Sequence, residues 1–556
     1  MTVIFILFYK YSHSVFYYDH GGLNIIGFFF AIFISLVIKF ILKLFSYIVK
    51  LNPKYKLAII LSLLYFYNII IDPINCKNWG LGLNNTYIIN DKNKYGCKIK
   101  HPKKCFYKIF SFTQDISKLF FVSCLKKKKN SREILLKVSK SPYINSTTIK
   151  FGFPLTNNEI GRKDGKDNGI IRKYSFQNLI DMEKPLPPKL SKPEYIVDFS
   201  NDPFGELLIN LNYNDSLSKE RNNKEINSIP YSNNILIIYI DSISRATSMR
   251  KLKKTLNFFE QFISYKGRHH KNYPNYNFHS FQFFKYHAHE GYTHYNFPIL
   301  FYGNRKTAKH FVRINKYLKE NGYITSYAAD SCLKDNTNTG RLLSKEELYD
   351  HQLLLCDPNM SHISTLTKRC LYGNINSYYL FEYTDQFWRK YKHNRKFSLL
   401  VSNEAHEGTL ELIKYTDDII YNFLNSLYDD NLLKDSTIFL LSDHGCPMPS
   451  IYFLNDFYII EKRLPMLYMI INDRKNINYN EQYFNINKNQ QILITGYDIY
   501  NTIGNIVYGD NYINIKNKSN NHDTPKTKKG ISLFDEIDPN QRNPKNYIYM
   551  STEFCS

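Results

Sequence analysis

The sequence lacks several patterns that assign proteins to common classes. It has no internal repeat and no pair of cysteines spaced for zinc as Cys-x-x-Cys. Its formal net charge of +24 comes without a helix-turn-helix, zinc-finger or aromatic recognition motif, and its densest basic run, Lys126 to Lys129, is short. Because lysine and asparagine are abundant along the whole chain, the charge reflects a compositional bias, and we predict no nucleic-acid partner.

Charge is also absent from two apolar segments near the N-terminus. Residues 23–38 and 57–71 contain no charged side chain, and with their flanks they predict membrane spans at 23–44 and 55–72. Lysines lie between the two segments, so the positive-inside rule puts that loop in the cytoplasm and the chain after residue 72 outside it. A signal peptide is the alternative for the first segment, although no small-residue cleavage site follows it. A single anchor at 57–71 would give the same sidedness.

Cysteine is missing from the first 75 residues, and all 9 cysteines follow the second apolar segment. Four of them cluster between Cys76 and Cys124, which predicts a disulfide framework in the lumen or outside the cell. The odd count leaves at least one cysteine unpaired. Glycosylation is compatible with the sequons at Asn84, Asn145, Asn214, Asn359 and Asn517.

The chain after residue 230 has the pattern of an α/β domain. The continuous apolar run ILIIYI (235–240) predicts a strand buried on both faces of a parallel sheet. Further strands are predicted at 324–330, 396–402 and 464–471 and at the start of STIFLLSDHG (436–445). Helical spacing appears between them, at 307–321 and 415–430. We therefore predict a mostly parallel central sheet flanked by helices. The predicted regions are a membrane-anchoring region 1–72, a cysteine-containing region and connector 73–230, a main domain 231–545 and a tail 546–556.

Acidic and histidine side chains follow two of the predicted strands. Asp241 comes directly after ILIIYI, and Asp443 and His444 follow TIFLLS. The carboxyl ends of parallel strands meet at one edge of a sheet, where ligands bind. Asp and His are costly to bury, and a divalent metal ion such as Zn, Mn or Ca would explain why they stand at the ends of buried strands. The alternatives are a helix N-cap or a turn position for Asp241 and a buried ion pair for Asp443 and His444.

Thr293 stands at the start of a short apolar stretch in HEGYTHYNFPILFYGN (289–304). A hydroxyl at a helix N-terminus beside a metal becomes a nucleophile, because the metal lowers its pKa and the helix amides stabilise the anion. A plain threonine N-cap is the alternative.

These stretches resemble the alkaline phosphatase-like superfamily, and within it a sulfatase-like family of unknown function that is typical of nematodes and insects. The resemblance covers roughly residues 75–556. It is carried by DSISRATSMRKLKKT (241–255), GYTHYNFPILFYG (291–303), CLYGN (370–374), FSLLVSNEAHEG (397–408), SDHG (442–445), EKRLP (461–465) and GISLFDEIDPNQR (530–542).

The resemblance implies a site for phosphate or sulfate esters. Asp241, Asp443 and His444 would bind one divalent metal with Thr293, which would form a covalent intermediate. His406 would bind a substrate oxygen or protonate the leaving group, or join Glu407 in a second metal site. Sulfatases place a cysteine ten residues before a glycine, where this chain has Thr293 before Gly303. A threonine nucleophile belongs to the phosphatase, phosphodiesterase and phosphoglycerol-transferase branches.

Two functions follow as expectations. One is a membrane-anchored, extracytoplasmic, metal-dependent hydrolase or transferase of phosphate or sulfate esters, with a glycan, lipid or other phosphoester as substrate. The other is a catalytically inactive ectodomain that binds glycans or proteins. Departures from the family pattern after SDHG, where the chain reads CPMPSIYFLNDFYII, favour the second. Retention of Asp241, Thr293, Asp443 and His444 favours the first.

Overall fold

The computed structural model divides the chain into two compact units, Met1–Asp72 with Phe106–Lys108, and Pro73–Cys105 with Ile109–Ser556. Of the first unit it describes isolated positions between 39 and 61, so the predicted spans 23–44 and 55–72 lie almost entirely outside the described residues. No helix within the described residues has both the length and the apolar character needed to cross a membrane. In the second unit the structure describes residues 147–152, 171–176, 195–198, 206–209, 211, 213–224, 229–263, 268–272, 277–303, 314–330, 349–354, 370–371, 374–406, 412–446, 461–472, 479–512, 530–539 and 542.

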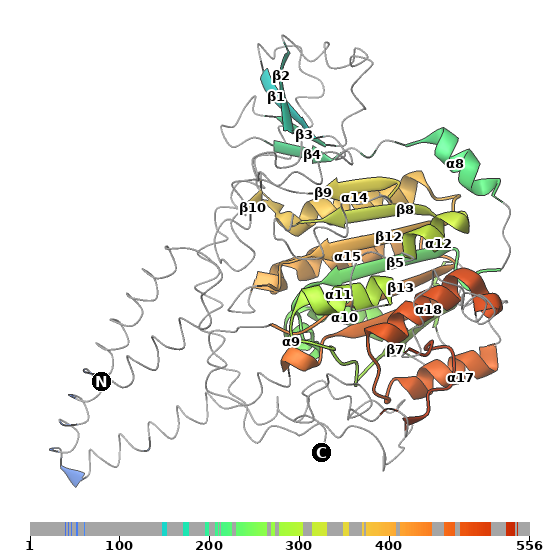
Figure 1. The fold of residues 1–556 in the computed structure, drawn as a ribbon. Helices are drawn as coiled ribbons and strands as arrows, with labels where there is room; N and C mark the ends of the chain where they lie inside the picture. Colours follow the sequence, from blue (N-terminus) through green and yellow to red (C-terminus); the bar gives the residue numbers. More distant parts are fainter. Residues whose placement is uncertain are drawn as a thin grey trace. The chain divides into compact units, whose positions relative to one another are not determined.

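An 8-stranded sheet forms the core of the second unit, in the order β6-β7-β14-β13-β5-β12-β8-β9 (Figure 1). Neighbouring strands from β13 to β9 run parallel, whereas β14, β7 and β6 each pair antiparallel with their neighbours. The predicted α/β fold with a mostly parallel sheet is confirmed. The strands are β5 (Asn234–Ile240), β6 (Arg268–His269), β7 (Asn277–Gln282), β8 (Ile324–Ala329), β9 (His351–Leu354), β12 (Lys396–Ser402), β13 (Ser436–Leu441) and β14 (Leu467–Asn472).

Helices cover both faces of this sheet, which explains why its central strands are continuously apolar. Alternate β5 side chains enter two different hydrophobic clusters, Leu236 and Ile238 in one and Ile237 and Tyr239 in the other. The first cluster includes α10, α14 and α15, and the second includes α11, α12, α17 and α18. The helices are α8 (Asp215–Asn222), α9 (Arg245–Lys251), α10 (Lys253–Glu260), α11 (Thr293–Tyr302), α12 (Ile314–Glu320), α14 (Asn376–Lys390), α15 (Asp417–Asp429), α17 (Tyr479–Asn489) and α18 (Gly496–Tyr508).

The predicted elements of the main domain correspond closely to these bounds. The helix expected at 415–430 is α15, preceded by the 3-10 turn η1 (Leu412–Thr416). Of the helix expected at 307–321, the described part is α12. The strand expected at 464–471 is β14, which begins three residues later and is antiparallel to β13.

A second, separate sheet was not predicted. Its 4 strands are all antiparallel and lie in the order β2-β1-β3-β4, within a stretch where the sequence shows little periodicity. The strands are β1 (Thr147–Gly152), β2 (Ile171–Phe176), β3 (Tyr195–Asp198) and β4 (Glu206–Ile209), and a further short pair joins β10 (Cys370–Leu371) to β11 (Asn374–Ile375).

The cysteines expected to form the disulfide framework, Cys76 to Cys124, lie outside the described residues. Cys446, directly after the SDHG sequence, is buried.

Candidate active site

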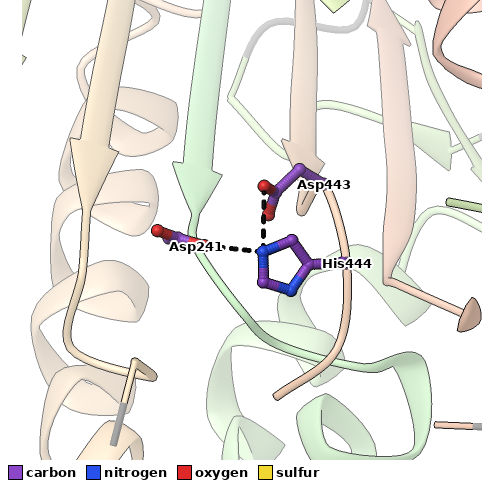
Figure 2. A group of neighbouring side chains, drawn as sticks. All are labelled: Asp241, Asp443 and His444. Carbon is purple, nitrogen blue, oxygen red and sulfur yellow. Dashed lines mark ion pairs between the residues drawn. The ribbon is translucent and has the colours of Figure 1, made fainter. Parts of the chain in front are cut away.

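Two neighbouring parallel strands deliver the acidic cluster. β5 and β13 pair in register, with Tyr239 opposite Leu441, so the residues that follow them emerge side by side at the carboxyl edge of the sheet. Asp241 follows β5, and Asp443 and His444 follow β13 (Figure 2). All three are at most 4% exposed. The structure brings these three predicted residues together.

The three side chains point toward one another. His444 Nε2 lies 3.6 Å from Asp241 Oδ1 and 3.4 Å from Asp443 Oδ2. One ligand atom from each residue lies within 4.8 Å of the others, an arrangement that can hold a metal ion. Figure 2 shows that one nitrogen of the imidazole ring faces both carboxylates.

The hydrogen bonds around this cluster fit a cation. His444 Nδ1 lies 2.6 Å from the Gly445 carbonyl oxygen, so Nδ1 carries the proton and the Nε2 lone pair faces the carboxylates. Asp443 Oδ2 is buried and accepts no hydrogen bond from the described residues. Burial and the negative charge of Asp443 raise the pKa of Asp241. Two buried acidic side chains that face the imidazole Nε2 therefore form a site that a divalent ion would stabilise.

Thr293 joins the cluster from a different part of the chain. Its Oγ1 donates to Asp241, 3.2 Å from Oδ1 and 3.3 Å from Oδ2, and lies 3.1 Å from His444 Nε2. Thr293 is the first residue of α11, and the N-cap is Tyr292, which makes no side-chain capping bond. The hydroxyl thus faces the acidic cluster, and the N-cap alternative for Thr293 is not supported. Asp241 is not an N-cap, because Ser244 is the N-cap of α9, but it does lie in the turn that follows β5, as the other alternative expected.

Asn296 fixes the loop that positions Thr293. Its Oδ1 accepts from the backbone amides of His289 and Glu290, and its Nδ2 donates to the carbonyls of Glu290 and Tyr292. One buried amide side chain therefore satisfies four backbone groups that no regular secondary structure would pair. This loop presents the helix N-terminus to the carboxyl edge of the sheet.

A close approach of two backbone segments explains why Gly445 follows the Asp443–His444 pair. A Cβ atom there would lie 2.0 Å from the Glu461 carbonyl oxygen and 2.7 Å from its carbonyl carbon. The Gly445 amide donates to the Lys462 carbonyl at 2.9 Å. Residues 443–445 therefore lie directly against 461–462, and only glycine allows that approach.

The segment 461–463 is fixed by buried polar contacts that the sequence analysis did not foresee. Glu461 accepts from Ser244 and Thr247 on α9 at 2.7 and 2.9 Å and pairs with Arg250 at 2.9 Å. Lys462 follows, with its ammonium 4.6 Å from the centre of the Tyr292 ring, and burial lowers its pKa. The signal in the sequence was the charged triplet in EKRLP.

His406 lies in the loop after β12, where its backbone amide donates to the Asn403 carbonyl. It is not part of the acidic cluster, and its role in substrate binding stays a prediction. Glu407, the expected partner in a second metal site, lies outside the described residues.

The carboxyl-terminal part of the chain matches a known family. Residues 305–556 match the family model described as "Protein of unknown function (DUF229)". Over residues 305–556 this match agrees with the predicted resemblance to a family of unknown function. The DUF229 match includes His406, Asp443 and His444, whereas Asp241 and Thr293 precede it. No curated protein matches the chain.

Several solved structures are distantly similar. A protein in the alkaline phosphatase superfamily from Vibrio parahaemolyticus is 15% identical, with 58% of this chain and 78% of that chain covered and a TM-score of 0.36. The lipoteichoic acid synthase LtaP from Listeria monocytogenes is 11% identical over 57% and 81%, with a TM-score of 0.36. The C-terminal periplasmic domain of EcEptC from Escherichia coli, in complex with Zn, is 12% identical over 60% and 98%, with a TM-score of 0.35.

Proposed function

We propose that the protein transfers phosphate or sulfate groups from esters, with Thr293 as the nucleophile and a divalent metal ion as cofactor. The observation that carries this proposal is the position of Thr293 Oγ1, which lies within hydrogen-bond distance of Asp241 and of His444 Nε2. A nucleophile beside a base and at a helix N-terminus is the arrangement that group transfer needs.

Each residue of the cluster has a defined task. Asp241, Asp443 and His444 would hold the metal ion, which supplies Lewis-acid chemistry by lowering the pKa of a hydroxyl and offsetting negative charge. Thr293 already donates its hydrogen bond to Asp241, so this carboxylate is the group that takes the proton as Oγ1 attacks phosphorus or sulfur.

The reaction then proceeds through a covalent ester on Thr293. The bond from Oγ1 to phosphorus or sulfur forms as the bond to the leaving oxygen breaks, and His406 gives that oxygen a proton. The first-turn amides of α11 stabilise charge on the equatorial oxygens. Water or an acceptor alcohol next attacks the same atom and gives its proton to His406. The bond to Oγ1 breaks, and Asp241 returns the proton to Thr293.

The test uses purified full-length protein and an Asp443→Asn variant. Bound metal is measured by elemental analysis, and both proteins are given aryl phosphate, aryl phosphodiester and aryl sulfate. We expect near-stoichiometric metal in the wild type, a loss of metal in the variant, and turnover of one ester class. Asp385→Asn is the matched control, because Asp385 pairs with Arg389 on α14, outside the cluster.

The outcomes separate the two expected functions. Metal and turnover that are both lost in Asp443→Asn but kept in Asp385→Asn support the enzyme. A folded wild type with neither metal nor turnover would leave the alternative, a sulfatase-like ectodomain that binds glycans or proteins.

We also propose that the enzyme is anchored in a membrane, with its site outside the cytoplasm. The support is the sequence of residues 23–44 and 55–72 and the lysines between them. Protease protection in sealed membranes tests this: the chain after residue 72 is expected to be protected in microsomes and accessible on intact cells or after permeabilisation.

A further inference from the structure

The end of β12 lies between the ends of β5 and β8 at the carboxyl edge of the sheet, where the strand order is β5-β12-β8. Ser402, the last residue of β12, lies opposite Ile240, the last residue of β5. Asp241 directly follows β5, and Asp330 directly follows β8. Both aspartates are buried, and of the two only Asp241 belongs to the acidic cluster. The end of β12 is therefore flanked by two strand ends that are each followed by a buried carboxylate.

Asp330 holds the end of β12 through both of its carboxylate oxygens. Its Oδ2 accepts from the Ser402 hydroxyl at 3.1 Å. Its Oδ1 accepts from the backbone amide of Asn403 at 2.9 Å and from the side-chain amide of the same residue at 2.8 Å. Hydrogen bonds that an ionised carboxylate accepts are stronger than those between neutral groups. One buried side chain on β8 therefore fixes two consecutive residues at the end of β12.

These two residues in turn receive the backbone amides of two candidate site residues. The Ser402 carbonyl accepts the Asp241 amide at 2.9 Å. The Asn403 carbonyl accepts the His406 amide, also at 2.9 Å. Asp330 is thus linked through one intervening residue to the backbone of Asp241, and through another to the backbone of His406.

The backbone of Asp241 depends on such contacts because the chain turns directly after it. Ser242, the next residue, has a φ of 65°, in the left-handed region that costs a residue with a side chain free energy. Such a conformation persists only where surrounding groups hold the chain. The bond from the Asp241 amide to Ser402 lies immediately before this turn. A shift at the end of β12 would move the Asp241 carboxylate, and a metal site tolerates a displacement of only about 0.5 Å.

We propose that Asp330 is a positioning residue for the acidic cluster, and that by holding the end of β12 it keeps Asp241 where its carboxylate can bind a divalent ion. This role rests on the proposed function and deepens it, because it extends the site to a residue that follows β8. Asp330 is not among the described residues whose ligand atoms meet in the cluster. It therefore acts through Ser402 and not as a metal ligand.

The test measures the affinity for Zn²⁺ in the absence of any ester. Metal-free full-length proteins are titrated with Zn²⁺ by isothermal calorimetry, and thermal unfolding checks that each variant is folded. Asp330→Ala removes both acceptor oxygens, and Ser402→Ala removes the hydroxyl alone. Asp350→Ala is the matched control, because Asp350 accepts the amide and the hydroxyl of Thr325 at the opposite end of β8, both at 2.9 Å.

We expect Asp330→Ala to weaken Zn²⁺ binding about 10-fold, as for the loss of a group that orients a metal ligand. Asp330→Asn keeps one acceptor oxygen, and its affinity should lie between those of wild type and Asp330→Ala. Ser402→Ala should also weaken binding, and the double variant should bind Zn²⁺ as Asp330→Ala does, because both changes remove the same hydrogen bond. Asp350→Ala should lower the Tm and leave the affinity for Zn²⁺ unchanged.

Wild-type affinity for Zn²⁺ in folded Asp330→Ala and Ser402→Ala would overturn the proposal. An equal loss of affinity in Asp350→Ala would overturn it too, since any loss of stability would then have the same effect. If Asp330→Ala does not fold, Ser402→Ala decides on the same terms.

The same measurements separate this role from the proposed function. Zn²⁺ binding and turnover that are both unaffected by the changes at Asp330 and Ser402 would leave the proposed function standing and remove this role. Zn²⁺ affinity that depends on Asp330, without turnover of any ester, would support this role and contradict the proposed function. A folded wild type that binds no Zn²⁺ would contradict both.

Discussion

Gly445→Ala tests whether the Asp443–His444 loop is held by close backbone contact. The added methyl group would lie 2.0 Å from the Glu461 carbonyl oxygen, which belongs to the backbone and cannot rotate away. Overpacking a buried site costs about 1–3 kcal/mol. Separating the two segments also breaks the bond from the Gly445 amide to the Lys462 carbonyl, which costs about 1–3 kcal/mol when the partner stays buried. We therefore expect a destabilisation of about 2–6 kcal/mol.

The assay compares thermal unfolding and bound metal in the same samples. We expect the Tm to fall by roughly 4–12 °C. The affinity for metal should fall about 10- to 100-fold, because the Gly445 carbonyl orients His444 through Nδ1. Gly496→Ala is the matched control. A Cβ there meets flexible side chains of Ile299 and Leu300 at 3.1–3.3 Å, and α18 gains a better helix former. A Gly445→Ala protein with wild-type Tm and metal content would refute the close approach.

Three further predictions concern single residues. Thr293→Val should lower kcat about 10³-fold or more and keep the bound metal, whereas Thr293→Ser should retain turnover. Equal rates for the two variants would exclude Thr293 as the nucleophile. Arg542→Met should lower the free energy of unfolding by about 3–5 kcal/mol, because it leaves the buried Asp498 without its cation. Arg389→Met, at a half-exposed ion pair, should lower the free energy of unfolding far less, and thermal unfolding compares the two variants. Burial lowers the pKa of Lys396 to about 7, so the folded state binds this proton less tightly than the unfolded state does. The stability of the wild type should therefore rise as the pH increases from about 7 toward the pKa of lysine in the unfolded chain. In a series of Tm values against pH, Lys396→Met should lack this rise.

The sheet was predictable because buried parallel strands leave a clear pattern. β5, β12 and β13 contain the apolar stretches ILIIYI, LLV and IFLL, and polar residues follow each stretch. Their parallel register then brings Asp241 and Asp443 together, since both follow the last paired residues of adjacent strands. The acidic cluster could therefore be located from strand ends alone.

Contacts that depend on loops and on the direction of pairing could not be predicted in this way. An apolar run does not encode direction, so β14 looked like the parallel strands although it is antiparallel. The contact between Lys462 and Gly291 joins segments that are far apart in the sequence, through the absence of a side chain. The polar residues of β1 to β4 alternate too weakly to distinguish an antiparallel sheet from a connector.

The acidic cluster differs from the other buried carboxylates of the main domain in how its charge is matched. Asp498 pairs with Arg542, and Glu461 pairs with Arg250. Asp417 accepts two backbone amides at the start of α10, which lowers the cost of its burial. No described residue donates a hydrogen bond to the buried Oδ2 of Asp443, and His444 directs Nδ1 to the Gly445 carbonyl oxygen. Unlike these three carboxylates, the pair has no cation and no set of backbone amides as partners among the described residues, and the metal ion proposed above would lie beside the hydroxyl of Thr293.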